Sequence, residues 1–206
     1  MSSKKLQIIF GKKIQNTLPY IFIIGGVVGL IASFILTIEH IDIVKDPLHQ
    51  LSCSIDPVLA CGPIMNSKEA TIFGFPNPLI GLVVFGAQIM LGAVMLAGAK
   101  MKSWFWKLYG LITAGSLTFS LWLIYHSLYI IEAICIYCFV VWLLVFATSW
   151  YLFQFMLAEN HIKTISARLK KFLRKHHGDM LAIIYLILAI LILNKFWYYY
   201  GPKLGF

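Results

Sequence analysis

Charged residues are scarce in this chain, and acidic ones most of all. Only 12% of the 206 residues are charged, and Asp and Glu together number 8. A soluble domain averages about 25% charged residues, so the composition points to a membrane protein. Internal repeats and low-complexity tracts are also lacking. The net charge of +9 does not indicate nucleic-acid binding, because the basic residues lie in short stretches between apolar runs, where they set membrane orientation.

Five apolar runs are long enough to cross about 30 Å of hydrocarbon as helices. The first run lacks an A-x-A cleavage site and is too long for a signal peptide, so we interpret it as a retained anchor. The chain is therefore predicted to be an all-α integral membrane protein. The predicted spans are roughly Tyr20–Ile38, Pro78–Ala99, Leu108–Tyr129, Ala133–Leu157 and Met180–Tyr200.

Basic residues are unevenly divided between the two sides that these spans define. The N-terminal tail and the connections after the second and fourth runs hold 13 lysines and arginines, and the other side holds 4. The positive-inside rule therefore predicts a cytoplasmic N-terminus. We expect a cytoplasmic basic tail over 1–19, a four-span membrane domain over 20–157 with an outer loop at 39–77, a cytoplasmic basic loop over 158–179, and a fifth transmembrane helix with an outer C-terminus over 180–206.

No cysteine lies on the predicted cytoplasmic side or in the middle of a span. Cys53 and Cys61 fall in the outer loop, and Cys135 and Cys138 begin the fourth span at its outer end. The outside of a cell membrane is where disulfides form and persist. The distribution of the cysteines therefore predicts redox chemistry at the outer surface.

The two cysteine pairs differ in what can reach them. Cys135 and Cys138 are expected on one face of the first helical turn, where the helix dipole stabilises a thiolate and apolar surroundings oppose it. At the edge of the bilayer, this pair is accessible to a lipid-soluble two-electron acceptor such as a quinone. The stretch CSIDPVLAC predicts a turn or short helix, whose cysteines a soluble protein thiol can reach. Two pairs in series would form a relay by thiol–disulfide exchange.

Two other interpretations of the cysteines stay open. The four thiols can together ligate a structural zinc ion, or they can form two static disulfides. A static bridge across a single helical turn closes so short a loop that it adds little stability. Either interpretation would make the chain a membrane protein without enzymatic activity.

The order of these features resembles the vitamin K epoxide reductase (VKOR) family, specifically bacterial members without a fused thioredoxin domain. The resemblance covers about residues 20–157. The stretch CGPIMNSKEATIFGFPNPLIG matches the family's loop, including its serine at Ser67 and its asparagine at Asn77. Asn77 before Pro78 is also an ordinary helix-start signal. DsbB-type oxidases have four spans too, but their cysteine pairs occur in the reverse order.

The resemblance implies a four-helix bundle around a quinone pocket, capped by the outer loop, with the fifth helix outside it. Carried over, Cys138 would reduce the quinone, and Cys135 would exchange with the loop pair through Cys61. Cys53 would form the mixed disulfide with a protein partner. The resemblance places Asn77, Ser67 and Trp142 in the quinone pocket. Animal members carry tyrosine where this chain has Trp142, whose indole donates but does not accept a hydrogen bond, so vitamin K epoxide chemistry is doubtful.

The function implied is that of a quinone-dependent thiol oxidase in the cell (inner) membrane. It would reoxidise a soluble extracytoplasmic thioredoxin-like (DsbA-like) protein and pass the electrons to ubiquinone or menaquinone, without a metal. The alternatives are a physiological vitamin K or quinone (epoxide) reductase, or a non-enzymatic membrane protein with structural disulfides or a zinc site.

Overall fold

The structure, a computed structural model, describes residues 3–46, 51–162 and 166–202. Within these ranges it is helical, and the only extended pairing is one isolated β-bridge. The helices are α1 (Ser3–Lys45), α2 (Cys61–Met65), the 3₁₀ turn η1 (Lys68–Thr71), α3 (Pro78–Leu96), α4 (Ser103–His126), the π turn η2 (Ser127–Ile131), α5 (Ile136–Ala158), α6 (Ala167–Lys175), α7 (His177–Lys195) and α8 (Trp197–Tyr200).

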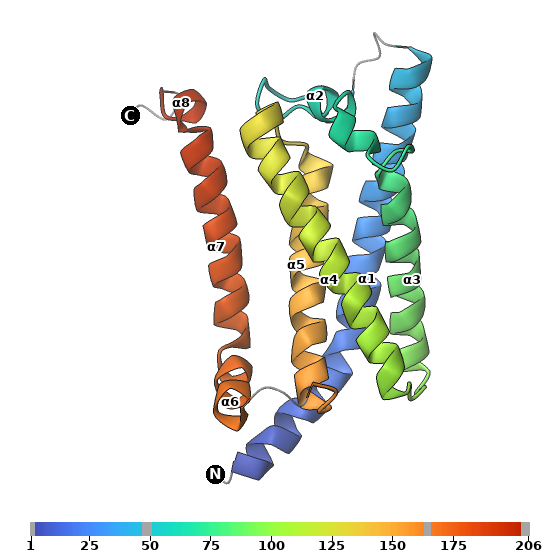
Figure 1. Ribbon diagram of the computed structural model, residues 1–206, viewed down its shortest axis with the longest axis vertical. Coiled ribbons are helices and arrows are strands. Elements are labelled where there is room, and N and C mark those ends of the chain that lie inside the picture. The colour runs from blue at the N-terminus through green and yellow to red at the C-terminus, as the bar shows by residue number, and fades with distance from the viewer. Residues whose placement is uncertain (1–2, 47–50, 163–165, 203–206) are drawn as a thin grey trace.

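Five of the helices are long and apolar enough to cross a membrane, which confirms the predicted number of spans. They are α1, α3, α4 with η2, α5 and α7. In Figure 1 they run side by side along the long axis, with α7 at the edge of the bundle and α2 at the end where α5 begins. The chain is therefore an all-α, multi-pass membrane protein. Lys163 and Lys203, two of the residues counted for orientation, lie outside the described residues.

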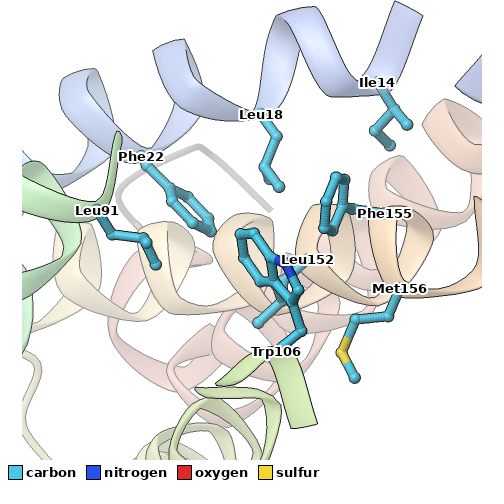
Figure 2. Close-up of a cluster of buried hydrophobic side chains, with 8 residues drawn as sticks. All are labelled: Ile14, Leu18, Phe22, Leu91, Trp106, Leu152, Phe155 and Met156. Carbon is cyan, nitrogen blue, oxygen red and sulfur yellow. The ribbon is translucent and has the colours of Figure 1, made fainter. Parts of the chain in front are cut away.

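The first helix is longer than the predicted span, because residues 3–19 are helical and continuous with it. The reason is an apolar row at helical spacing. Ile14, Leu18 and Phe22 are buried at 4%, 0% and 0% exposure. They pack against Trp106 of α4 and Phe155 of α5 (Figure 2). Pro19 lies inside the helix and lacks the N–H for one helical hydrogen bond. The packing of this apolar row offsets that loss, so the helix continues past Pro19.

Several other boundaries differ from the predicted ones by a few residues, and three of these differences have identifiable local reasons. The third span ends in a π turn that closes at Glu132, whose φ of 58° is left-handed. The fourth helix begins only at Ile136, because the preceding residues are extended and form the β-bridge. The predicted fifth span divides at Phe196 into α7 and the short α8.

Small residues bring α1 and α3 into close contact, as is common between transmembrane helices. A Cβ added at Gly29 of α1 would lie 2.5 Å from the ring of Phe85. Phe85 belongs to α3 and is itself buried, at 3% exposure. The glycine is therefore required for this helix–helix approach. A Cβ at Gly86, the next residue on α3, would meet nothing within 4 Å.

We predict that Gly29→Ala destabilises the bundle by about 1–3 kcal/mol, the usual cost of overpacking a core. Gly86→Ala is the matched control and should be neutral or slightly stabilising, since alanine is the better helix former. Unfolding in mixed detergent–SDS micelles, followed by circular dichroism, measures both. Equal midpoints for the two variants would contradict the close α1–α3 packing.

Candidate active site

The site is built on a two-bond contact between the outer loop and the segment before α5. Ala60 donates its N–H to the carbonyl of Ile134 at 3.1 Å, and Ile134 donates to the carbonyl of Val58 at 2.7 Å. These bonds form the parallel β-bridge between Leu59 and Ile134. Cys61 directly follows Ala60 in one segment, and Cys135 directly follows Ile134 in the other. The bridge therefore sets a loop cysteine beside a membrane-edge cysteine 74 positions away.

Three sulfur atoms meet at this point. Cys53 and Cys61 are joined by a disulfide, and the Sγ of Cys135 lies 2.9 Å from the Sγ of Cys61. All three sulfurs lie within 4.8 Å of one another. Cys53, Cys61 and Cys135 are also nearly fully buried, at 2%, 0% and 1% exposure. A thiolate on Cys135 is thus in contact with one sulfur of an existing disulfide, the arrangement that exchange requires.

The sequence led us to expect Cys135 in the first helical turn. In the structure it lies one position earlier, at the N-cap of α5. Its backbone is extended, and its sulfur accepts the N–H of Cys138 at 3.4 Å. A side-chain hydrogen bond from Cys138 is the largest influence, and it lowers the pKa of Cys135. The N–H groups of Cys138 and Tyr137 act in the same direction, whereas burial and the charge of Glu39 oppose them. On balance the pKa of Cys135 is lowered, which makes its thiolate easier to form than that of an ordinary cysteine.

Cys135 and Cys138 line a cavity of about 170 Å³. Its wall is mostly apolar and comes from α1, α3, α4, α5 and the loop segment with α2 and η1. An apolar cavity of about 150 Å³ is large enough to hold benzene, so this one has room for a single quinone ring. Ser67, Asn77 and Trp142, the three residues predicted for the quinone pocket, all belong to its wall.

Asn77 takes the N-cap position of α3, but its side chain does not cap the helix. Instead the amide nitrogen donates to the carbonyl of Glu69 at 2.6 Å. The amide oxygen is buried and has no hydrogen-bond partner among the described residues. The second N–H can serve a quinone carbonyl, and the oxygen can accept from a hydroquinone hydroxyl. The side chain therefore suits both redox forms of such a ligand.

Ser67 and Trp142 occupy different parts of the wall. The Ser67 hydroxyl donates to the carbonyl of Ile64 at 2.8 Å and so closes the end of α2. Trp142 is buried at 2% exposure, one helical turn after Cys138. Its position on the same face as Cys138 follows from their spacing, and both side chains line the cavity.

Sequence reasoning missed Glu39. Glu39 is a buried residue of α1 whose carboxylate accepts from the N–H of Ser52 at 3.1 Å and from the Ser52 hydroxyl. It thereby fixes the residue next to Cys53. His126 joins His40 and Glu69 in the cavity wall. A carboxylate near the end of an apolar run was the available signal for Glu39.

The model of the vitamin K epoxide reductase family matches residues 20–153, a range that includes all four cysteines. The chain belongs to the VKOR family. A search of curated proteins returned no match.

Membership of the VKOR family makes this chain an oxidoreductase, and the family as a whole is one of quinone-linked thiol/disulfide oxidoreductases. The matched range includes α3, α4, most of α5 and the part of α1 from residue 20 onward. The segment that follows, with α6, α7 and α8, lies beyond it. Family resemblance thus accounts for the cysteine site and its cavity but not for the fifth membrane helix.

We predict that Glu39→Gln shifts the pH profile of Cys135 alkylation to lower pH. The glutamine keeps an oxygen for Ser52 but removes the charge that raises the pKa of Cys135. Alkylation is measured on protein with the loop disulfide intact, and peptide mass mapping separates Cys135 from Cys138. Asp42→Asn removes a carboxylate one turn further along α1 and should leave the profile in place. A profile that is unchanged or higher in Glu39→Gln would contradict this electrostatic link.

Proposed function

We propose that the protein is a thiol oxidase that passes two electrons from a soluble protein to a membrane quinone. The observation that carries this proposal is the 2.9 Å contact between the sulfurs of Cys61 and Cys135. It joins a disulfide in the outer loop to a thiol pair that lines an apolar cavity. One cysteine pair thereby serves a partner in water, and the other serves a partner dissolved in lipid.

The relay begins when the partner's dithiol reduces the Cys53–Cys61 disulfide, with Cys53 forming the mixed disulfide. The Cys61 thiolate then attacks Cys135 of an oxidised Cys135–Cys138 pair, and Cys138 leaves as a thiolate. Next, the Cys53 thiolate attacks Cys61 and releases Cys135. The loop pair is oxidised again, the C-x-x-C pair holds both electrons, and the two protons lost by the loop thiols go to Cys135 and Cys138. This product state has the pairing seen in the structure.

The quinone, ubiquinone or menaquinone, supplies the two-electron acceptor for the last step. We assign to Cys138 the transfer of electrons from the protein to the quinone. Re-formation of the Cys135–Cys138 disulfide releases two electrons and two protons, which the quinone takes up. Asn77 would hold a ring oxygen through the amide N–H that does not bond Glu69. Trp142 and Ser67 shape the wall of the cavity. None of these roles involves a metal.

The partner that we infer is a soluble, thioredoxin-like protein of the DsbA type outside the cell membrane. Cys53 is the partner-facing thiol in this proposal, but it is 2% exposed. Release of Ser52 from Glu39 is one local change that would free the segment next to Cys53. We therefore expect the partner to engage an opened loop.

The remaining topology is proposed on the distribution of charge. We propose that residues 20–157 form the redox domain in the cell membrane, with the cysteines outside and the basic segments 1–19 and 158–179 on the cytoplasmic side. The short helix α2 and the beginning of α5 lie at one end of the bundle (Figure 1). Cys61 is the first residue of α2 and Cys135 is the N-cap of α5, so this arrangement is compatible with the proposed orientation.

The test is quinone reduction by the purified full-length chain, with a reduced thioredoxin-like protein as donor. We expect turnover in the wild type and only the protein-free background rate in Cys138→Ala. Asn77→Ala should raise KM for the quinone about tenfold, since it removes a hydrogen bond to the ligand. Thr118→Ala, on an exposed face of α4, is the control and should match the wild type.

Two results would overturn the proposal. One is a wild-type protein that reduces neither ubiquinone nor menaquinone analogues while its cysteines resist mild dithiol. The other is stoichiometric zinc that stays bound during purification and is lost when Cys135 is replaced. The three clustered sulfurs have a spacing that a metal can use, although two of them are bonded to each other in the structure.

A further inference from the structure

Burial along the fifth membrane helix is deepest just beyond its last residue. Along α7 itself, Leu188 is the buried residue. Phe196, immediately after α7, has 0% exposure. It shares a buried cluster with Val58 of the cysteine loop, Ile134 of the β-bridge and Trp142 of the cavity wall. The helix that stands at the edge of the bundle in Figure 1 is therefore anchored at the end that carries the cysteine site.

Two polar contacts flank this apolar anchor. The ammonium group of Lys195 donates to the carboxylate of Glu132 at 2.7 Å, and it also lies 5.6 Å from the ring centroid of Tyr129. The hydroxyl of Tyr200 donates to Oδ2 of Asp56 at 3.3 Å. Burial first, and then the charge of Asp56, raises the pKa of Tyr200, so the hydroxyl keeps the proton that it donates.

Asp56 and Glu132, the two acidic partners, lie on the two segments that the β-bridge joins. Asp56 accepts the N–H groups of Val58 and Leu59 through Oδ1, both at 2.8 Å, and thus shapes the turn between the loop cysteines. Glu132 has the left-handed φ of 58° at which the π turn ends and the extended segment to Cys135 begins. A non-glycine residue in this region is held there by its surroundings. Lys195 and Tyr200 therefore contact the two chain segments that the bridge joins.

We propose that Lys195, Phe196 and Tyr200 form a clasp that positions the cysteine loop against the segment before α5 and so sets the rate of exchange between Cys61 and Cys135. The clasp lies outside the range matched by the family model, so it gives the fifth membrane helix a role in this chain. It consists of positioning residues, because each acts through Asp56, Glu132 or the bridge and not on a sulfur atom. This inference rests on the proposed relay.

The polar part of the clasp acts locally. The Lys195 and Glu132 side chains are 23% and 52% exposed, and ion pairs with such exposure contribute little to global stability. Their loss should move the loop without unfolding the bundle. Exchange is sensitive to such movement, because the attacking and leaving sulfurs must be aligned in contact.

The test measures electron transfer from the loop pair to the C-x-x-C pair, without quinone. Fully oxidised, full-length protein in detergent is mixed with one equivalent of reduced thioredoxin-like donor. Acid quenching, alkylation and peptide mapping then follow the appearance of thiols at Cys135 and Cys138. We expect Lys195→Met/Tyr200→Phe to slow this transfer about tenfold at an unchanged unfolding midpoint, as expected for two lost polar contacts.

Matched variants separate positioning from general damage. Tyr198→Phe removes a hydroxyl from an exposed side chain on the same short helix and should transfer at the wild-type rate. Lys195→Arg keeps the charge opposite Glu132 and should restore most of the rate. Tyr200→Phe alone removes a single oxygen atom and should fold. Its rate of electron transfer can therefore be measured even if the double variant does not fold.

The outcomes distinguish this inference from the function on which it rests. If the wild type transfers electrons and the double variant does so at the same rate, the clasp is overturned and the relay stands. If the double variant does not fold, a wild-type rate in Tyr200→Phe has the same meaning. A wild-type protein whose C-x-x-C pair never receives electrons from the loop overturns the relay, and the clasp with it. Equal slowing in Tyr198→Phe would also contradict the clasp, because that side chain is not part of it.

Discussion

The site depends on one short backbone contact, the parallel bridge between Leu59 and Ile134. Two hydrogen bonds hold a loop that follows the first membrane helix against the chain that leads into the fourth. Cys61 lies two residues after Leu59 and Cys135 lies directly after Ile134, so the 2.9 Å contact between their sulfurs is a consequence of this pairing. Other features support the same contact: Glu39 fixes the residue beside Cys53, and Asp56 shapes the turn.

The bridge also lies at the boundary between two environments. Toward the outer end, the loop carries a disulfide that a soluble partner would reduce. Toward the membrane, Cys138 faces a largely apolar cavity whose wall includes Asn77. Thiol–disulfide exchange needs contact between sulfurs, whereas a quinone needs an apolar site. In the proposed relay, joining the two at the start of a membrane helix would let exchange between the two cysteine pairs connect a water-soluble partner with a lipid-soluble one.

The sequence was sufficient for the parts of this structure that follow from composition and order. Apolar run lengths predicted the five spans, and the order of the cysteines predicted the family. The β-bridge could not be predicted, because two backbone hydrogen bonds between distant segments leave no mark in residue type. The N-cap position of Cys135 depends on that bridge and was missed with it. The extension of α1 was visible in the spacing of Ile14, Leu18 and Phe22, but Ile14 and Leu18 lie before the apolar run that marked the predicted span.

The contact between Cys61 and Cys135 is tested most directly by leaving only those two cysteines in the chain. In Cys53→Ser/Cys138→Ser, mild oxidation should join Cys61 to Cys135 rapidly and completely in the folded, detergent-solubilised protein, as shown by non-reducing peptide mapping. The complementary variant, Cys61→Ser/Cys135→Ser, should form little or no disulfide. A folded Cys53→Ser/Cys138→Ser protein that stays unlinked, or a complementary pair that links as readily, would contradict the relay at its central step.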